Sequence, residues 1–178
     1  MRVLETDRLS LRHLEAADAA FMLQLLNDPS FIRNIGDRGV RTEQAARQYT
    51  LDGPIASYQR HGYGLYLVEL KSTGEPAGIC GLVKRDYLED PDIGFAFLPA
   101  YWHQGYAFES AVAVKAHAFD VLHLPRLLAI TSPGNSSSIR LLERLGLGFQ
   151  RMISPPGRDE VLRLFSIERA PPPQAPFS

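Results

Sequence analysis

The sequence predicts a single α/β domain in which a mixed β-sheet carries helices on its faces. The chain of 178 residues is long enough to bury one substantial core and too short for two domains of ordinary size. Segments with the alternating period of strands are interleaved with segments of helical period. The expected order is strand, two helices, three strands, helix, strand, helix and two strands, which is typical of a mixed sheet covered by helices.

The composition is that of an ordinary globular protein, with 45% hydrophobic and 22% charged residues. The net charge of −1 and the absence of a long basic run argue against nucleic acid or an anionic membrane as a partner. No stretch reaches the ~18 apolar residues of a membrane span, and the opening MRVLETDRLS lacks an apolar signal core. We therefore expect a cytoplasmic protein, either monomeric or homodimeric. The single cysteine, Cys80, cannot form an intramolecular disulfide, which fits a reducing compartment.

The first elements are a strand and a helix. Apolar and polar side chains alternate over residues 2–14, which predicts one half-buried strand. Glu15 to Asn27 then places its apolar residues on one helical stripe, and Pro29 follows as a stop.

A second helical stretch opens at Thr42, a suitable N-cap, with Glu43 in the first turn, where its charge favours the helix dipole. Gly53 and Pro54 interrupt this stretch, since proline removes a helix donor and clashes with the preceding turn. The sequence leaves open a kink or two short helices, of which the second would start near Asp52.

Three alternating segments at 63–70, 76–83 and 91–98 predict an antiparallel meander. The remaining elements are a helix from Gly105 to about Leu122, a buried central strand at 126–131, a helix capped by Asn135 and stopped by Gly146, and strands at 149–153 and 161–167. The domain is therefore expected over residues 1–168. Residues 169–178 contain four prolines and are expected to form an extended, flexible tail.

The segment Asp92 to Glu109, DIGFAFLPAYWHQGYAFE, is expected to bind an anion. A strand runs to Pro99, and a short loop then enters a helix through Gly105. The first turn of a helix has backbone N–H groups without internal partners, and the helix dipole adds positive potential there. Gly105 would let a phosphate approach the backbone, while small Ala107 keeps the turn open. A glycine at this position can also serve only as a backbone bend.

Longer motifs in the sequence resemble a known family. DIGFAFLPAYWHQGYAFESA resembles the acetyl-CoA-binding motif of GNAT acetyltransferases, and NSSSIRLLERLGLGF resembles the motif that follows it. LETDRLSLRHLEAADA and GYGLYLVELKSTGEPAGICGL are similar to the branch that contains the ribosomal-protein N-terminal acetyltransferases. The resemblance spans residues 4 to about 168. It implies a mostly antiparallel, splayed sheet and an acetyl-CoA-dependent N-acetyltransferase without a metal.

The resemblance also implies positions for the cosubstrate. Pantetheine would extend the sheet along the backbone of Phe97 and Leu98. The pyrophosphate loop maps to Trp102, His103, Gln104, Gly105, Tyr106 and Ala107. Trp102 stands where the family pattern has Arg or Gln, but backbone donors depend little on side-chain identity. Asn135 matches an asparagine that contacts the cosubstrate near the pantetheine, a role that can coexist with helix capping.

Two residues are candidates for proton transfer. Asp92 occupies the position where relatives often carry a glutamate base, although it can also be a solvated carboxylate at the start of a strand. Ser138 matches a serine proposed to protonate the thiolate in the ribosomal-protein branch, although its hydroxyl can also return to the backbone. Leu142 replaces the tyrosine that many members use as the acid. Cys80 is expected to be a buried, unreactive thiol, and the histidines have no metal-ligand spacing.

The expected acceptor is a primary amine, most plausibly the α-amino group of a protein or peptide, attacked directly on the thioester. A small-molecule amine acetyltransferase and a non-catalytic acyl-CoA-binding module remain alternatives. Nucleotide binding is disfavoured because GxxxxGK[ST] and GxGxxG are missing. Family substrate loops map to 35–39 and 49–63. Arginines in or near the first of these loops either receive an acidic acceptor or are solvated surface residues: Arg33, Arg38 and Arg41.

Overall fold

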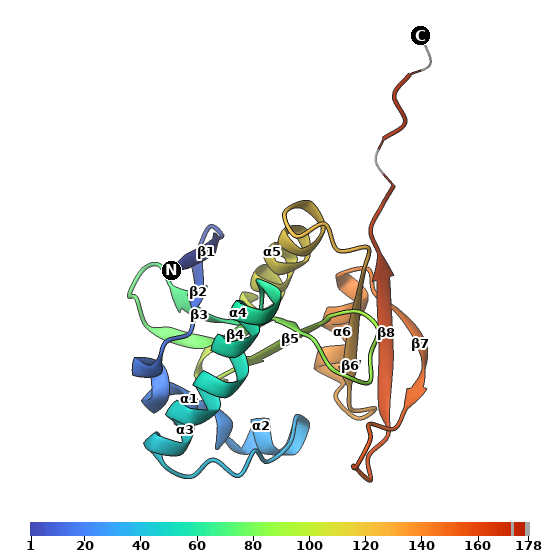
Figure 1. Ribbon diagram of the computed structural model, residues 1–178. Helices are drawn as coiled ribbons and strands as arrows, with labels where there is room; N and C mark the ends of the chain where they lie inside the picture. Colours follow the sequence, from blue (N-terminus) through green and yellow to red (C-terminus); the bar gives the residue numbers. More distant parts are fainter. Residues whose placement is uncertain (172, 177–178) are drawn as a thin grey trace.

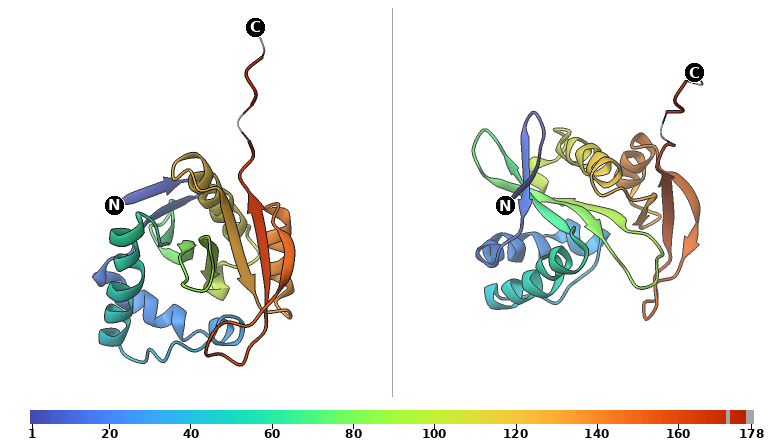
Figure 2. Two further views of the ribbon diagram at one scale, coloured as in Figure 1. Left: turned by 45° about the vertical axis from the view of Figure 1, so that its right-hand side comes forward. Right: turned by 45° about the horizontal axis from the view of Figure 1, so that its top comes forward.

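A computed structural model describes residues 1–171 and 173–176. The eight strands form one sheet in the order β1-β2-β3-β4-β5-β6-β8-β7 (Figure 1). The helices of the N-terminal half cover one face of this sheet, and α5 and α6 cover the other (Figure 2). The mixed α/β sheet covered by helices that the sequence predicts is confirmed.

The N-terminal segment contains two strands, β1 (Arg2–Glu5) and β2 (Leu9–His13), which pair antiparallel. The prediction of one strand over residues 2–14 is therefore wrong. A tight turn separates the strands because Thr6 bonds to Leu9 twice: its N–H donates to the Leu9 carbonyl at 2.9 Å, and its hydroxyl accepts from the Leu9 N–H at 3.0 Å. Alternation alone does not reveal this turn, because apolar residues resume the same pattern after it.

The first helical region contains a 3-10 turn at Ala16–Asp18, helix α1 (Ala19–Leu26) and a second helix, α2 (Pro29–Asn34). The sequence did not predict α2. Asp28 and Pro29 end α1 and also start α2, since the Asp28 carboxylate accepts from the Ser30 N–H and proline is favoured at the first helical position.

Helix α3 (Glu43–Thr50) begins as predicted, with the Thr42 hydroxyl accepting from the Ala45 N–H at 3.1 Å. Gly53 and Pro54 lie in a π-helical turn at Leu51–Ile55, after which α4 (Ala56–His61) continues. The second helical piece starts at Ala56 rather than near Asp52, because the wider π turn accommodates the proline before α-helical bonding resumes.

The expected meander is present as β3 (Leu65–Leu70), β4 (Pro76–Val83) and β5 (Asp92–Phe97). The chain then forms α5 (Tyr106–Asp120), β6 (Arg126–Thr131), α6 (Ser136–Arg144), β7 (Gly148–Ile153) and β8 (Leu162–Glu168). No helix or strand follows β8 in residues 169–171 and 173–176, which extend away from the sheet (Figure 1). The rest of the predicted tail, 172 and 177–178, lies outside the described residues.

Hydrophobic cores form on both faces of the sheet. Alternate residues of β3 and β4 face opposite cores: Val68 and Cys80 pack towards α5 and α6, whereas Leu67 and Ile79 pack towards α1 and α3. No helix of the described residues is long and apolar enough to cross a membrane.

A glycine in β4 is required by this packing. A Cβ at Gly81 would lie 2.1 Å from the Gly64 carbonyl oxygen and 2.8 Å from the Leu65 Cα. Gly81→Ala should lower the free energy of unfolding by about 1–3 kcal/mol, because both neighbours are backbone atoms that cannot move aside cheaply. Urea unfolding measures this change. Gly148→Ala is the matched control, since a Cβ there meets nothing within 4 Å. Equal stability of the two variants would contradict the packing described.

Candidate functional site

The candidate site begins where two parallel strands separate. β5 and β6 pair at one register position, Asp92 with Leu128, supported by a 3.0 Å bond from the Leu128 N–H to the Pro91 carbonyl. Beyond this position the strands diverge (Figure 1), while the other edge of β5 pairs with β4 as far as Phe97. The diverging edge therefore offers backbone donors and acceptors to an extended ligand.

A cavity of about 900 Å³ occupies this opening. Its walls come from both halves of the sheet, from the first turns of α5 and α6, and from α2 and the loop after it. The Ser132 hydroxyl donates to the Asn34 carbonyl at 3.3 Å and so joins the end of α2 to the loop after β6. A cavity of this size is in the range of ligand sites.

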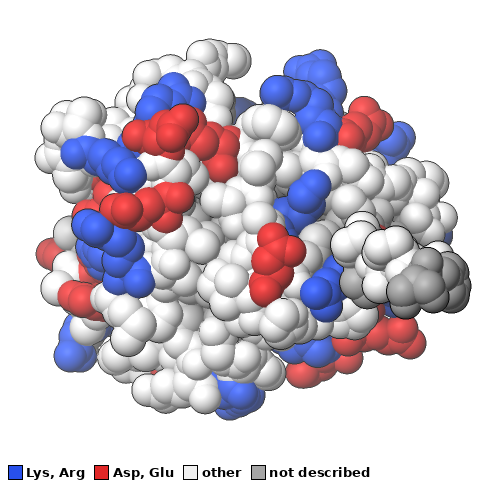
Figure 3. Space-filling model, turned by 90° about the horizontal axis from the view of Figure 1, so that it is seen from above, with Lys and Arg blue, Asp and Glu red and all other residues white. Residues whose placement is uncertain are grey.

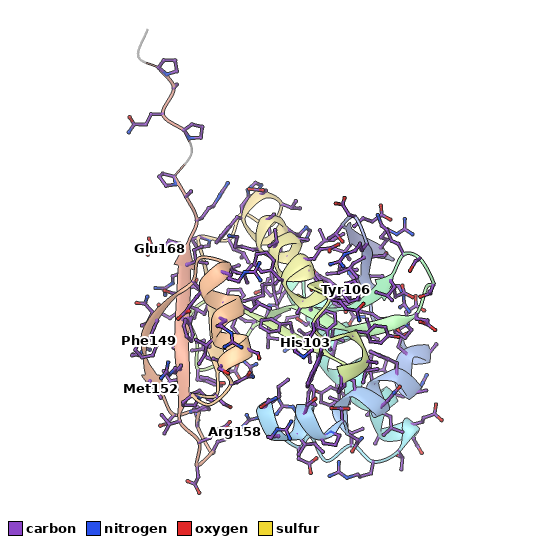
Figure 4. All side chains as sticks on the ribbon, turned by 180° about the vertical axis from the view of Figure 1, so that it is seen from behind. His103, Tyr106, Phe149, Met152, Arg158 and Glu168 are labelled. Carbon is purple, nitrogen blue, oxygen red and sulfur yellow. The ribbon has the colours of Figure 1, made fainter. Side chains whose placement is uncertain are left out.

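The first turn of α5 is open to an anion. Gly105 is its N-cap with φ +82°, and no side chain caps the turn. The first intrahelical bond of the turn is the 3.0 Å bond from the Glu109 N–H to the Gly105 carbonyl, so the N–H groups of Tyr106, Ala107 and Phe108 have no intrahelical acceptor. These donors and the helix dipole suit a diphosphate. Figure 4 shows His103 and Tyr106 at this end of α5.

An ion pair links the first turn of α5 to the β1–β2 turn. Glu109 accepts from the Arg8 Nε at 2.7 Å and from the Thr6 hydroxyl, and the Arg8 guanidinium lies 4.5 Å from the centre of the Tyr106 ring. Burial acts to raise the pKa of Glu109, but the bonds from Thr6 and Arg8 outweigh it and hold the pKa below its usual value. Arg8 thus offsets a carboxylate that would otherwise oppose an anion at this helix end.

The predicted cosubstrate and catalytic residues converge on the cavity, with two exceptions. The residues that line it are Asp92, Phe97, Trp102, His103, Gly105, Tyr106, Ala107, Asn135 and Ser138. Leu98 is buried outside the lining, and its N–H donates to the Ala77 carbonyl at 3.0 Å. Gln104 is exposed, and its amide donates to the Ala100 carbonyl at 3.3 Å.

The structure gives Trp102 a role in place of the family's Arg or Gln. Its indole N–H donates to the Phe97 carbonyl at 2.8 Å, which ties the loop to the end of β5. A carbonyl has two lone pairs, so the Phe97 oxygen can still accept from a ligand. The bond also fixes the loop that leads into Gly105.

Asp92 lies at the base of the opening and is 1% exposed. It is therefore not a solvated carboxylate at the start of a strand. The Arg85 Nε donates to its Oδ1 at 2.9 Å. Burial raises the pKa of Asp92 to about 6, although Arg85 acts to lower it. Sequence reasoning missed Arg85; the β4–β5 register, which places Val83 opposite Asp92, brings the loop after β4 to this carboxylate.

Asn135 caps α6, its side-chain oxygen accepting from the Ser138 N–H at 3.2 Å. Ser138 is half-buried in the first turn, and Leu142, at the position of the usual tyrosine, is 1% exposed. Cys80 lies outside the cavity lining and is buried, which raises the pKa of its thiol to about 12, so the expectation of an unreactive thiol is met. Within the described residues, no group of three or more His, Cys, Asp or Glu side chains could hold a metal.

A family model described as an acetyltransferase (GNAT) domain matches residues 8–148. The chain belongs to the GNAT acetyltransferase family. The protein YkkB of Bacillus subtilis is 31% identical over 153 residues, covering 84% of this chain and 87% of YkkB. The N-acetyltransferase YoaA of the same organism is 28% identical over 172 residues, covering 96% of this chain and 91% of YoaA. An acetyltransferase structure from Agrobacterium tumefaciens has a TM-score of 0.78 at 27% identity, with 93% of each chain covered.

These comparisons confirm the family expected from the sequence motifs. The chain is an N-acetyltransferase of a family that uses acetyl-CoA and acts on amine acceptors. The residues of this GNAT domain also fit the cosubstrate: a diverging strand edge for pantetheine and an uncapped helix end for the pyrophosphate lie in one cavity.

Coenzyme A should raise the melting temperature of this acetyltransferase by about 5–10 °C at ~100 times its Kd, because a ligand selective for the native state stabilises it. Gly105→Glu should remove most of that shift by placing bulk and negative charge at the helix end. Differential scanning fluorimetry measures both shifts.

Gly74→Glu is the matched control. Gly74 also has a left-handed backbone, φ +76°, but lies in the β3–β4 turn outside the cavity lining. The control should lose stability from backbone strain and keep the shift on adding coenzyme A. If Gly105→Glu keeps the full shift, the phosphate site lies elsewhere.

Proposed function

We propose that this N-acetyltransferase moves the acetyl group of acetyl-CoA to the α-amino group of a protein or peptide, by direct attack of the amine within the β5–β6 cavity. The observation that carries the proposal is the position of Asp92. A buried carboxylate with a raised pKa lies at the base of an open cavity, where the strand edge expected to bind pantetheine begins.

Acetyl-CoA supplies the activated acyl group. The backbone of β5 near Phe97 would hold the pantetheine, and the N–H groups at the start of α5 would hold the pyrophosphate. Asn135 would contact the pantetheine with the part of its amide that does not cap α6. These contacts fix the thioester relative to the amine, which is the main requirement of a direct attack.

Asp92 is proposed as the base that receives the amine proton. With a pKa of about 6 it is largely ionised at pH 7 and still more basic than an ordinary aspartate. The bond from Arg85 holds one carboxylate oxygen and so orients the group. An α-amino group, with a pKa near ~7.7–8.0, is partly unprotonated at this pH, whereas an unperturbed lysine near ~10.4 is not.

Ser138 is proposed to serve the departing thiolate. It lines the cavity in the first turn of α6, where the positive end of the helix dipole would stabilise developing negative charge. Leu142 cannot donate a proton, so the usual tyrosine acid has no equivalent at that position.

A protein of the same fold supports a peptide acceptor. A ribosomal L7/L12 α-N-protein acetyltransferase in complex with coenzyme A has a TM-score of 0.81 at 17% identity, covering 94% of this chain and 98% of its own. A spermidine N-acetyltransferase chimera shares the fold with a TM-score of 0.73 at 16% identity, which keeps a small-molecule amine as the rival acceptor. Cytoplasmic location and oligomeric state stay predictions of the sequence.

The acceptor is tested by incubating the protein and acetyl-CoA with a peptide library and a panel of small amines, followed by mass spectrometry. The proposal expects acetyl groups on peptide α-amino nitrogens and none on the same peptides with formylated N-termini. Acetylation of small amines alone would reject the peptide acceptor. Absence of thiol release with every amine, while coenzyme A still binds, would identify a non-catalytic module.

The pH dependence of kcat/KM tests Asp92. The activity of the unaltered enzyme should fall as the pH drops through about 6, because protonation of Asp92 removes the base. Asp92→Asn should lower kcat by about 100-fold to 10,000-fold, lose this step near pH 6 and recover partly at high pH, where more amine is unprotonated.

Ser138→Ala separates the two roles. This variant should also lose kcat but keep the step near pH 6, and high pH should not rescue it, since thiolate departure does not depend on the protonation of the free amine. Near-normal kcat in both variants across this pH range would mean that orientation alone carries the reaction.

A further inference from the structure

Basic side chains greatly outnumber acidic ones in the cavity lining. The acidic residues of the lining are Asp92 and Glu160, whereas its arginines are Arg33, Arg38, Arg85, Arg140, Arg144 and Arg158. The chain as a whole has a net charge of −1, and basic and acidic side chains are interspersed on the face seen in Figure 3. The positive charge of the cavity is therefore local.

The acids at this site are already paired. Asp92 bonds to Arg85 at 2.9 Å, and Glu160 pairs with Arg158 at 3.0 Å. Asp37, the acidic residue of the α2–α3 loop, pairs with Arg41, which does not line the cavity. In residues 1–171 and 173–176, Arg33 and Arg38 form no ion pair, so they carry the surplus charge on their wall.

The arginines divide between the two ends of the cavity. Arg140 and Arg144 lie on α6, and Arg144 lies 4.0 Å from the centre of the Phe108 ring, at the helix end assigned to the pyrophosphate. Arg33 lies on α2 and Arg38 on the loop that follows. These segments belong to the face of the sheet opposite to α5 and α6 (Figure 2). The β7–β8 loop carries Arg158 towards α2 (Figure 4). The second group thus lies on the side left for the acceptor.

We infer that the acceptor carries a carboxylate near its reacting amine, bound by Arg33 and Arg38 at the mouth of the acceptor side. The inference rests on the proposed function and adds the substrate class: a peptide with acidic residues next to its N-terminus, or an acidic amino acid. The amine would approach Asp92, while the guanidinium groups would hold the carboxylate. A polycation such as spermidine would meet unpaired positive charge instead.

Initial rates of thiol release from acetyl-CoA test this preference. The matched acceptors are Ser-Glu-Asp-Gly and Ser-Gln-Asn-Gly, both with amidated C-termini, then the α-amides of glutamate and glutamine, with spermidine as the cationic amine. The acidic member of a pair should have a kcat/KM about 10-fold higher or more, because a hydrogen bond to a charged partner contributes about that factor. The advantage should shrink as salt is added. Whether it appears with the peptides or with the amino-acid amides identifies the source of the carboxylate.

Variants assign the preference to residues. Arg33→Gln and Arg38→Gln should each reduce the advantage of the acidic acceptor, and the double variant should remove most of it, while kcat/KM for the neutral acceptor stays nearly unchanged. Arg38→Glu should favour Ser-Lys-Lys-Gly over Ser-Glu-Asp-Gly. Arg47→Gln is the control: Arg47 is exposed on α3, lies outside the cavity lining and changes the net charge equally. An unchanged thermal shift with coenzyme A shows that each variant is folded.

Equal rates for acidic and neutral acceptors, or a preference for spermidine, would overturn the inference and leave the proposed acetyl transfer standing if a peptide amine still reacts. An acidic preference that survives in the Arg33→Gln, Arg38→Gln double variant would also overturn it, because other groups would then bind the carboxylate. If no amine releases thiol, the proposed function fails and this inference falls with it.

Discussion

The parallel strands β5 and β6 hold the two halves of the sheet together through one register position and then separate, and the site depends on this divergence. On one side, β4 keeps β5 straight as far as Phe97; on the other, β8 pairs with the whole of β6. Because both strands are held by their outer neighbours, the gap between them is a fixed feature of the fold. The unpaired strand edge costs free energy in water-poor surroundings unless a ligand or water satisfies it.

The cavity presents different charged and polar groups at the start of α5 and at the point where β5 and β6 separate. At one end, the uncapped turn of α5 attracts an anion, and Arg8 offsets the only carboxylate in that turn, Glu109. Near the point where the strands separate, Asp92 is buried against Arg85, and burial raises the pKa of this carboxylate to about 6. Under the proposed function, the anionic cosubstrate would meet the positive end of the α5 dipole, and the reacting amine would meet the Asp92 carboxylate.

The sequence predicted the elements that have local causes. The limits of β6 and the caps Thr42 and Asn135 follow from hydrophobic period and side-chain chemistry within a few residues. The features it missed have two kinds of cause. Some depend on turns that periodicity does not register, such as the β1–β2 turn at Thr6 and the junction between α1 and α2. Others depend on contacts between distant segments. The pairing of Glu109 with Arg8, 101 residues apart, is of the second kind. Of the nine cosubstrate positions that the resemblance implies, seven lie in the cavity lining; Leu98 and Gln104 lie outside it, because β4 pairing and the loop conformation set their surroundings.

Amide hydrogen exchange with and without coenzyme A tests the central claim, that the diverging β5 edge and the first turn of α5 form one cosubstrate site. The account predicts slower exchange, on adding coenzyme A, at Tyr106, Ala107 and Phe108 and along residues 94–97 of β5, because the ligand would accept from or cover these amides. The β3–β4 turn around Gly74, outside the cavity, should exchange at an unchanged rate. Unchanged exchange at both the α5 turn and β5, with protection appearing elsewhere, would contradict the account.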